Sequence, residues 1–335
     1  MENKDLLHLN YNQIAGLKLK DLRLSISGSI LEDRIKKLLN ELEYKRLQFR
    51  PHIWISEGWF TPDDIPGFGV PFYLLHKKLI KLEKREMFEA EGEGISECMK
   101  ILRHETGHAI SHAYYLYKNR EWKDIFGKYN ARYPVYYTPN PGSRNFVEHL
   151  NAWYAQAHPV EDFAETFAVW LNPKSNWKKK YSGWGALNKL KYVDQVMNNL
   201  KTKPQLNNST DTLDELKELN NTIKNYYKRK KKFYTIKWPE TYDKDLKKIF
   251  ISNGSGEPAS LFMKKRRAKI RNKIAEVLDV PAYTIDQLIL NMIKRCKELN
   301  YKNVTDQDET EKRLLIILAA QLNNYIHSGY FKIPL

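Results

Sequence analysis

The chain has 335 residues, of which 42% are hydrophobic and 13% aromatic, which is enough to bury a sizeable core and excludes overall disorder. It carries a formal net charge of +16 and only two cysteines, so a disulfide framework is excluded. No apolar run approaches the roughly 18 residues of a membrane span, and the first residues lack the pattern of a secretory signal, so we expect a cytoplasmic protein without a membrane partner.

The first two hundred residues alternate between predicted strands and helices. Residues 21–26 are predicted as a strand, and a capping box that begins at Ser29 predicts the start of a helix. Two short β-prone runs follow at 53–57 and 70–75. Pro71 favours an edge position, so an extended peptide substrate can add to the sheet along 70–75 if these residues border the cleft.

The densest chemical signal is the pattern His-Glu-x-x-His formed by His104, Glu105 and His108. Residues 97–118 contain no proline and carry an apolar stripe, which predicts a helix with both histidines on one face, able to bind one Zn²⁺. Glu105 then lies beside the metal and can take a proton from a zinc-bound water, which predicts metal-assisted hydrolysis. His112 lies about 12 Å along the helix from His104, so we expect it to pack or support rather than bind the metal.

Two histidines and a water leave zinc one protein ligand short. Position 114 is tyrosine and position 111 is serine, which excludes the metzincin arrangement with its third histidine. The predicted helix at 158–171 offers Glu161 and Glu165 instead, four residues apart on one face. Their surroundings are almost wholly apolar, where an ionised carboxylate is costly to bury without a cation.

Together, these residues resemble the gluzincin pattern, in which the histidine motif is followed by two acidic residues. The resemblance implies that His104, His108 and Glu161 are the zinc ligands. It also implies that Glu165 accepts the free imidazole N–H of a ligand histidine and fixes its orientation.

The stretch from Tyr154 to Glu165 resembles the corresponding part of the anthrax lethal factor and Pro-Pro endopeptidase catalytic domains. This resemblance implies that the Tyr154 hydroxyl donates a hydrogen bond to the negative charge that develops during hydrolysis; His158 is the alternative donor. Over its full length the chain is similar to a family of bacterial zinc-binding metallopeptidases, with the likeness carried by 57–62, 71–76, 103–108, 153–156, 161–171 and 283–287.

The remaining chain is predicted to be helical and basic. Residues 201–234 are predicted as a polar and basic linker between a catalytic domain at 1–200 and a helical region at 235–335. Basic residues cluster at 228–232 and 264–273, where they either attract polyanions or form solvated helix faces. Apolar residues recur at helical spacing in three places, 270–278, 285–296 and 314–326.

The sequence therefore predicts an α+β fold, with a zincin-like catalytic domain of a small mixed sheet and active-site helices followed by a mainly α-helical C-terminal region. We expect a zinc metallopeptidase that cleaves a protein or peptide substrate with water activated by Glu105. The alternative is a metal-containing regulator that binds nucleic acid through its basic C-terminal helices. A structural zinc site without turnover is disfavoured, because such sites usually have four protein ligands.

Overall fold

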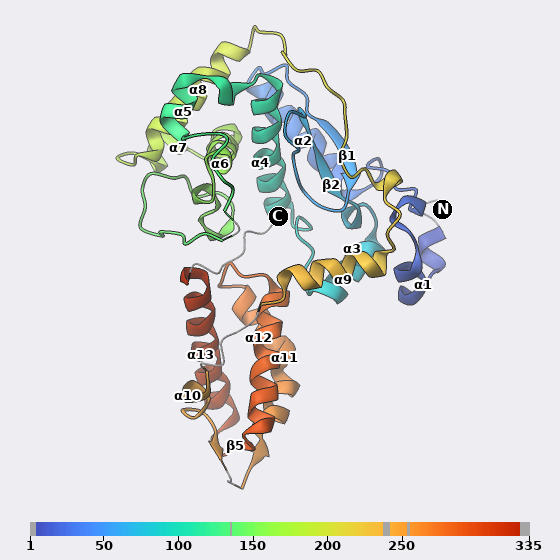
Figure 1. Ribbon diagram of the computed structural model, residues 1–335, viewed down its shortest axis with the longest axis vertical. Helices are drawn as coiled ribbons and strands as arrows, with labels where there is room; N and C mark the ends of the chain where they lie inside the picture. Colours follow the sequence, from blue (N-terminus) through green and yellow to red (C-terminus); the bar gives the residue numbers. More distant parts are fainter. Residues whose placement is uncertain (1–4, 135, 237–241, 253–254, 329–335) are drawn as a thin grey trace. The chain divides into compact units, whose positions relative to one another are not determined.

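The computed structural model describes residues 5–134, 136–236, 242–252 and 255–328. These residues divide into two compact units, the first made of 5–86 and 90–226 and the second of 87–89 and 227–328 (Figure 1). The division falls inside the predicted linker 201–234, and within helix α9 (Ile223–Tyr234). Both units combine helices with small sheets, so the fold is mixed and mostly helical.

The first unit contains a two-stranded parallel sheet. Strand β1 (His52–Ser56) pairs with β2 (Gly67–Pro71), with His52 opposite Gly67. Phe60 forms an isolated antiparallel bridge to Gly69, and the Gly69 N–H donates to the Phe60 carbonyl over 2.9 Å. The segment that contains Phe60 therefore pairs with β2 at Gly69, the middle residue of that strand.

Two predicted strands are wrong in whole or in part. The run 70–75 is a strand only as far as Pro71, because η3 (Phe72–Leu75) is a 3₁₀ helix that buries all four of its side chains, whereas a strand would turn alternate ones outward. No strand forms at 21–26, where the Leu24 N–H donates to the Leu22 carbonyl two residues back. The peptide-binding edge predicted along 70–75 is therefore not available as an extended strand.

Helices build most of the first unit. Ser29 is the N-cap of α2 as predicted, since its hydroxyl accepts the Leu31 N–H over 3.2 Å, but the full capping box is not formed, because Glu32 accepts the N–H of Gly28 instead of that of Ser29. The helices are α1 (Tyr11–Gly16), α2 (Ile30–Tyr44), α3 (Lys77–Met87), α4 (Ile95–Ala113), α5 (Arg120–Phe126), α6 (Pro159–Leu171), α7 (Trp177–Lys180) and α8 (Ala186–Leu200), with 3₁₀ turns η1 (Asp5–His8), η2 (Leu19–Asp21), η4 (Leu116–Lys118), η5 (Asn151–Gln156) and η6 (Leu216–Glu218).

Helices α4 and α6 pack directly against each other at the centre of this unit. Nearly every side chain of α6 is buried, as its mainly apolar sequence from Phe163 to Leu171 predicts. Gly107 of α4 faces Ala164 of α6 so closely that a Cβ atom built on Gly107 would lie 2.8 Å from the Ala164 Cα. A glycine at this crossing therefore sets how near the two helices can approach.

The second unit is a set of helices with a small antiparallel sheet of order β3-β5-β4. Its elements are α10 (Asp243–Leu246), β3 (Ile251–Ser252), β4 (Glu257–Pro258), α11 (Ala259–Ala275), α12 (Ala282–Glu298), β5 (Tyr301–Asn303) and α13 (Gln307–His327). The predicted helices at 285–296 and 314–326 are confirmed as parts of α12 and α13, and the one at 270–278 is confirmed only as far as Ala275, where α11 ends; Val277 is exposed.

Ion pairs join α11 to its two neighbours. Arg267 and Arg271 bind the fully buried carboxylate of Asp286 on α12. Lys269 and Lys273 bind the buried carboxylate of Glu311 on α13, with the Lys273 ammonium 2.8 Å from its oxygen. The predicted basic cluster at 264–273 thus supplies partners for two acids inside the same unit.

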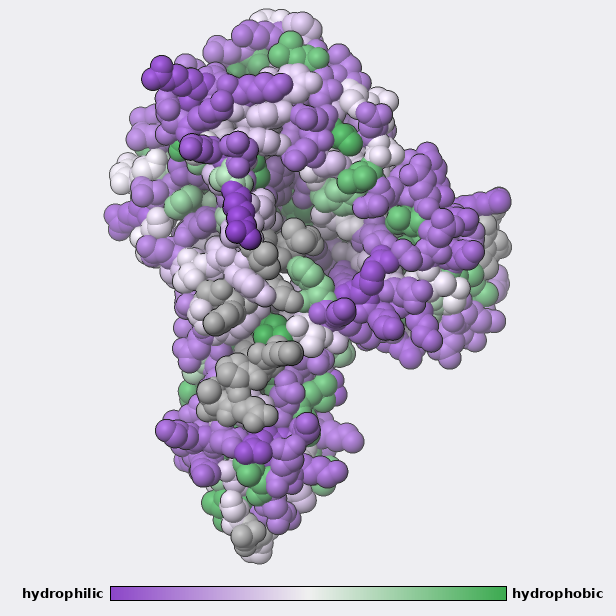
Figure 2. All heavy atoms as spheres, viewed as in Figure 1, coloured by the Kyte–Doolittle hydropathy of each residue, from purple (hydrophilic) through white to green (hydrophobic). Residues whose placement is uncertain are grey.

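The visible surface is mainly hydrophilic, with hydrophobic side chains scattered rather than gathered in one large patch (Figure 2). Among the described residues, no helix combines the length and the apolar character that a membrane crossing requires.

Candidate metal centre

Helix α4 carries the two histidines of the motif on one face. His104 is buried and His108 half-buried, and their Nε2 atoms lie 3.0 Å apart, as expected for residues one helical turn from each other. The helix runs without interruption from Ile95 to Ala113, so the predicted helical placement of the motif is confirmed. The helix predicted over 97–118 ends early, because Tyr115 adopts a left-handed conformation with φ of 51°.

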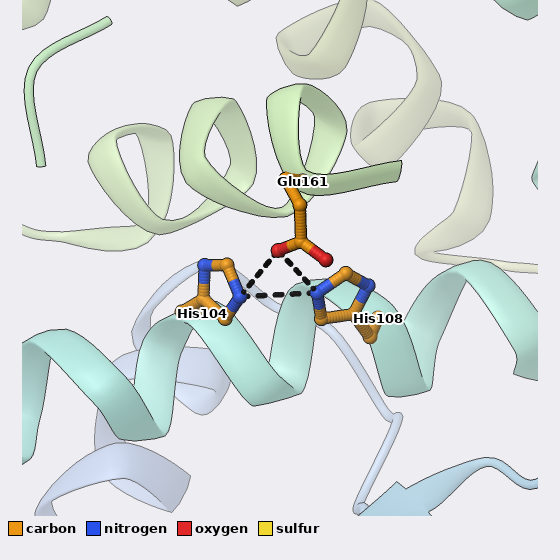
Figure 3. Close-up of side chains that lie close together, drawn as sticks. All are labelled: His104, His108 and Glu161. Atoms are coloured by element: carbon orange, nitrogen blue, oxygen red, sulfur yellow. Dashed lines mark hydrogen bonds and ion pairs between the residues drawn. The ribbon is translucent and has the colours of Figure 1, made fainter. Parts of the chain in front are cut away.

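Helix α6 brings a carboxylate to the same point. It begins with His158 as its N-cap and Pro159 at its first position, which places Glu161 in the first turn. One oxygen of Glu161, Oε2, lies 3.0 Å from His104 Nε2 and 3.2 Å from His108 Nε2 (Figure 3). The structure thus brings together the three residues that the gluzincin resemblance implies as ligands.

Glu165 lies behind His104. Its Oε1 atom accepts the His104 Nδ1–H over 2.8 Å, and its Oε2 atom accepts the backbone N–H of Leu150 over 2.8 Å. Because Nδ1 carries the proton, the lone pair of His104 Nε2 points into the centre. Glu165 is fully buried, so its charge is satisfied by these two donors alone among the described contacts.

The arrangement fits a metal ion. The Nε2 atoms of both histidines and one oxygen of Glu161 lie 3.0 to 3.2 Å from one another, a cluster that needs either a metal ion or protons on the histidines to hold it together. A tetrahedral zinc ion with ligands at about 2.0–2.1 Å separates its ligand atoms by about 3.3 Å. Among the residues that the structure describes, His104, His108 and Glu161 form the single group of three or more such side chains that could hold a metal.

The same contacts shift the pKa values of His104 and Glu161. Burial acts to lower the pKa of His104, but the hydrogen bonds and charges of Glu161 and Glu165 outweigh it and hold that pKa well above its ordinary value. Burial acts to raise the pKa of Glu161, but the positive charge of His108 and the hydrogen bonds of both histidines hold it well below its ordinary value. Without metal, a proton therefore supplies positive charge that a divalent cation would otherwise provide.

Glu105 is buried beside the histidines on α4. The Thr61 hydroxyl donates to its Oε2 atom over 2.8 Å. This contact orients the carboxylate from a segment far away in sequence, and sequence reasoning missed it because Thr61 belongs to a turn-rich stretch without periodicity.

The segment that carries Thr61 is held by an aromatic cluster at the end of α4. Tyr117 donates to Asp64 over 2.6 Å, Tyr129 donates to Asp63 over 2.5 Å, and the two rings stack with centroids 4.0 Å apart. His112 packs against both rings, and its Nδ1 atom accepts the Asp64 N–H over 3.2 Å. Burial, with the charge of His108, lowers the pKa of His112 to about 4, and the residue lies outside the metal cluster.

Two tyrosines, Tyr133 and Tyr154, lie next to the metal centre. The half-buried Tyr154 lies in η5 with its ring centroid 5.5 Å from that of His104. Its hydroxyl is 3.4 Å from that of Tyr133, which in turn donates to Glu161 Oε1 over 2.6 Å. Burial, followed by the charge of Glu161, raises the pKa of both phenols, so both stay protonated as donors.

Tyr133 is a residue that sequence reasoning missed. It lies in an irregular segment between α5 and η5, and no motif or spacing connects it to Glu161. Just before Tyr154, the backbones of Ala152 and Trp153 adopt left-handed conformations with φ of 58° and 54°. Such conformations are uncommon for residues with side chains and often accompany functional sites.

His158, the alternative donor, already has a partner on each ring nitrogen. Nδ1 accepts the Val160 N–H over 3.3 Å, and Nε2 is 2.9 Å from the carbonyl of Ala131. The residue therefore caps α6, whereas the Tyr154 hydroxyl points toward the tyrosine next to the centre.

Comparison with known proteins gives one similarity. Residues 84–234 match the model of a family described as "Putative zinc-binding metallo-peptidase". The match includes the stretches 103–108, 153–156 and 161–171 but not 57–62, 71–76 or 283–287, so it is narrower than the full-length likeness drawn from the sequence. The chain has no significant match among curated proteins or among solved structures. The part of the chain that carries the candidate metal centre is thus similar to a family of zinc-binding metallopeptidases.

Proposed function

We propose that this chain is a zinc-dependent metalloendopeptidase. In this proposal His104, His108 and Glu161 bind one Zn²⁺, Glu105 acts as the general base, and Tyr154 stabilises the developing negative charge. The single observation that supports it is that His104 Nε2, His108 Nε2 and Glu161 Oε2 lie 3.0 to 3.2 Å from one another. Glu165 bonds the other ring nitrogen of His104, Nδ1, so Nε2 is left to face the centre.

The number of ligands supports a catalytic site rather than a structural one. Catalytic zinc sites have three protein ligands and a fourth position for water, whereas structural sites have four protein ligands. The cluster has three, and the carboxylate of Glu105 lies on the same helix without belonging to it. Such a spare carboxylate has no role in a closed structural site.

Each residue then has a defined task. Zinc, when bound, polarises the peptide carbonyl and makes the attacking water more acidic. Glu105, oriented by Thr61, takes the proton of that water and passes it to the leaving amine. Tyr154 donates its hydroxyl proton in a hydrogen bond to the oxygen of the tetrahedral intermediate. Glu165 keeps His104 in one tautomer and one orientation throughout.

We propose a protein or peptide as the substrate. The support is the similarity of residues 84–234 to a peptidase family, together with the acid–base and oxyanion groups that amide hydrolysis requires.

The test replaces Glu105 by glutamine, which keeps the size of the side chain and removes the base. We expect Glu105→Gln to bind about one zinc per chain and keep its circular dichroism spectrum, while cleavage of fluorescent casein and of a mixed peptide library falls by about 10² to 10⁴-fold. Glu97→Gln is a matched control, because Glu97 lies on the exposed surface of the same helix.

Two results would overturn the proposal. One is cleavage by Glu105→Gln at the rate of the wild type, and the other is absence of cleavage by wild-type protein loaded with zinc. When both variants behave as expected, new N-termini that form in a cell extract with wild type but not with Glu105→Gln identify the substrates.

A further inference from the structure

The two oxygens of Glu161 have different partners. Oε2 faces the Nε2 atoms of both histidines, whereas Oε1 accepts the Tyr133 hydroxyl over 2.6 Å. Figure 3 shows one oxygen between the two imidazoles and the other without a contact to either of them. Tyr133 therefore contacts the side of the carboxylate that the histidines leave free.

We propose that Tyr133 is a positioning residue that restricts Glu161 to binding zinc through one oxygen, and so keeps a coordination position open for water. This inference rests on the metal centre of the proposed function. A carboxylate can bind a metal through one oxygen or two, and a zinc site can expand from four ligands to five. If Oε1 also bound the metal, the site would expand to five ligands, and Oε1 would crowd the position at which the attacking water binds.

The hydrogen bond belongs to a strong class, because it joins a neutral donor to a charged acceptor at short range. Glu161 is buried, so little water competes for its Oε1 atom. Removal of the Tyr133 hydroxyl would leave that oxygen without its described donor.

Tyr133 is itself fixed to the helix that carries the ligand. Its ring stacks on the imidazole of His158, with centroids 4.6 Å apart and an angle of 24° between the ring planes. His158 is the N-cap of α6, and its Nε2 atom bonds the carbonyl of Ala131, close to Tyr133 in sequence. The phenol and the carboxylate are thus anchored to the same helix end and keep their mutual geometry.

The test uses Tyr133→Phe, which keeps the ring and its stacking and removes the hydroxyl. The matched control is Tyr129→Phe, because Tyr129 also donates to a carboxylate, that of Asp63, which is outside the metal cluster. Each protein is freed of metal and loaded with Co²⁺, whose visible absorption is stronger with four ligands than with five. X-ray absorption of the zinc-loaded proteins gives the same coordination number independently.

We expect wild type and Tyr129→Phe to show about four ligands, and Tyr133→Phe to show about five together with a loss of cobalt absorption. Because 37% of Tyr133 is exposed, removal of its hydroxyl should leave the core intact, which circular dichroism checks. The same coordination number in Tyr133→Phe and wild type would overturn this inference alone. Wild-type protein that binds neither zinc nor Co²⁺ would overturn the proposed function and this inference with it.

Discussion

Gly107 offers the sharpest test of how the two helices build the metal centre. It lies between Glu105 and His108, where α4 crosses α6. A Cβ atom at this position would lie 2.8 Å from the Cα and 3.0 Å from the carbonyl oxygen of Ala164. Ordinary contacts of this kind begin at 3.4 Å, so in Gly107→Ala the helices must separate by about 0.6 Å at this point.

The expected magnitude combines two opposing effects. Overpacking a filled core costs about 1–3 kcal/mol, and we take the upper end because backbone atoms have no alternative rotamer. Alanine is more favourable than glycine inside a helix by about 1 kcal/mol, which leaves a net loss of about 2 kcal/mol in the free energy of unfolding. Glu161 lies one turn before Ala164 and moves with it, so we also expect zinc affinity to fall about 10 to 100-fold, as when a supporting group is lost.

Urea unfolding of the metal-free protein measures the first effect, and competition with a chromophoric chelator measures the second. Gly16→Ala is the control, because Gly16 also lies in a helix and a Cβ atom there would meet nothing within 4 Å. A Gly107→Ala variant with wild-type stability and wild-type zinc affinity would refute the reasoning. An equal loss in both variants would attribute the effect to helix chemistry rather than to the crossing.

Three further predictions concern single groups around the centre. Glu165→Gln should lower zinc affinity about 10 to 100-fold in the chelator assay, because His104 loses its charged acceptor; unchanged affinity would contradict this role. Thr61→Val should slow hydrolysis about tenfold at unchanged zinc content, because Glu105 loses its donor, and Thr61→Ser should restore the rate; a slow Thr61→Ser variant would speak against the hydrogen bond. The pKa of His104 is raised in the folded, metal-free protein, so binding of this proton stabilises the fold. The stabilisation is complete when the pH is below the ordinary pKa of 6.5, and it is lost as the pH rises through the raised pKa. The free energy of unfolding should thus decline on the alkaline side of neutrality, and a His104→Asn variant that shows the same decline would assign it to another group.

The candidate metal ligands and Glu165 could be predicted from the sequence because they form two pairs, each within one turn of a single helix. His104 and His108 are one turn apart on a helix whose apolar stripe is visible in the sequence. Glu161 and Glu165 are likewise one turn apart in an apolar helix, although their assignment to separate roles came from a family resemblance. Helical periodicity therefore placed two pairs of side chains, and only the meeting of the two helices needed the structure.

The supporting residues could not be predicted because their contacts are long-range. Tyr133 reaches Glu161 from an irregular segment, and Thr61 reaches Glu105 across 44 positions of sequence. Neither Tyr133 nor Thr61 lies at a sequence spacing that indicates which residue it contacts. The strand predicted at 21–26 and the part of the predicted strand 70–75 beyond Pro71 were wrong for a related reason, since a short β-prone segment forms a strand only where a neighbouring strand offers hydrogen bonds.

The basic cluster of α11 shows how tertiary contacts change the meaning of a charge pattern. In the sequence, 264–273 is a concentration of positive charge that can attract polyanions. In the second unit, Asp286 and Glu311 come from two other helices and bind four of these cations. The arginine charges are partly used inside the unit, whereas the side chains of Lys269 and Lys273 remain 57% and 47% exposed. The packing of the second unit thus accounts for part of the charge of this cluster, and binding of nucleic acid stays a prediction.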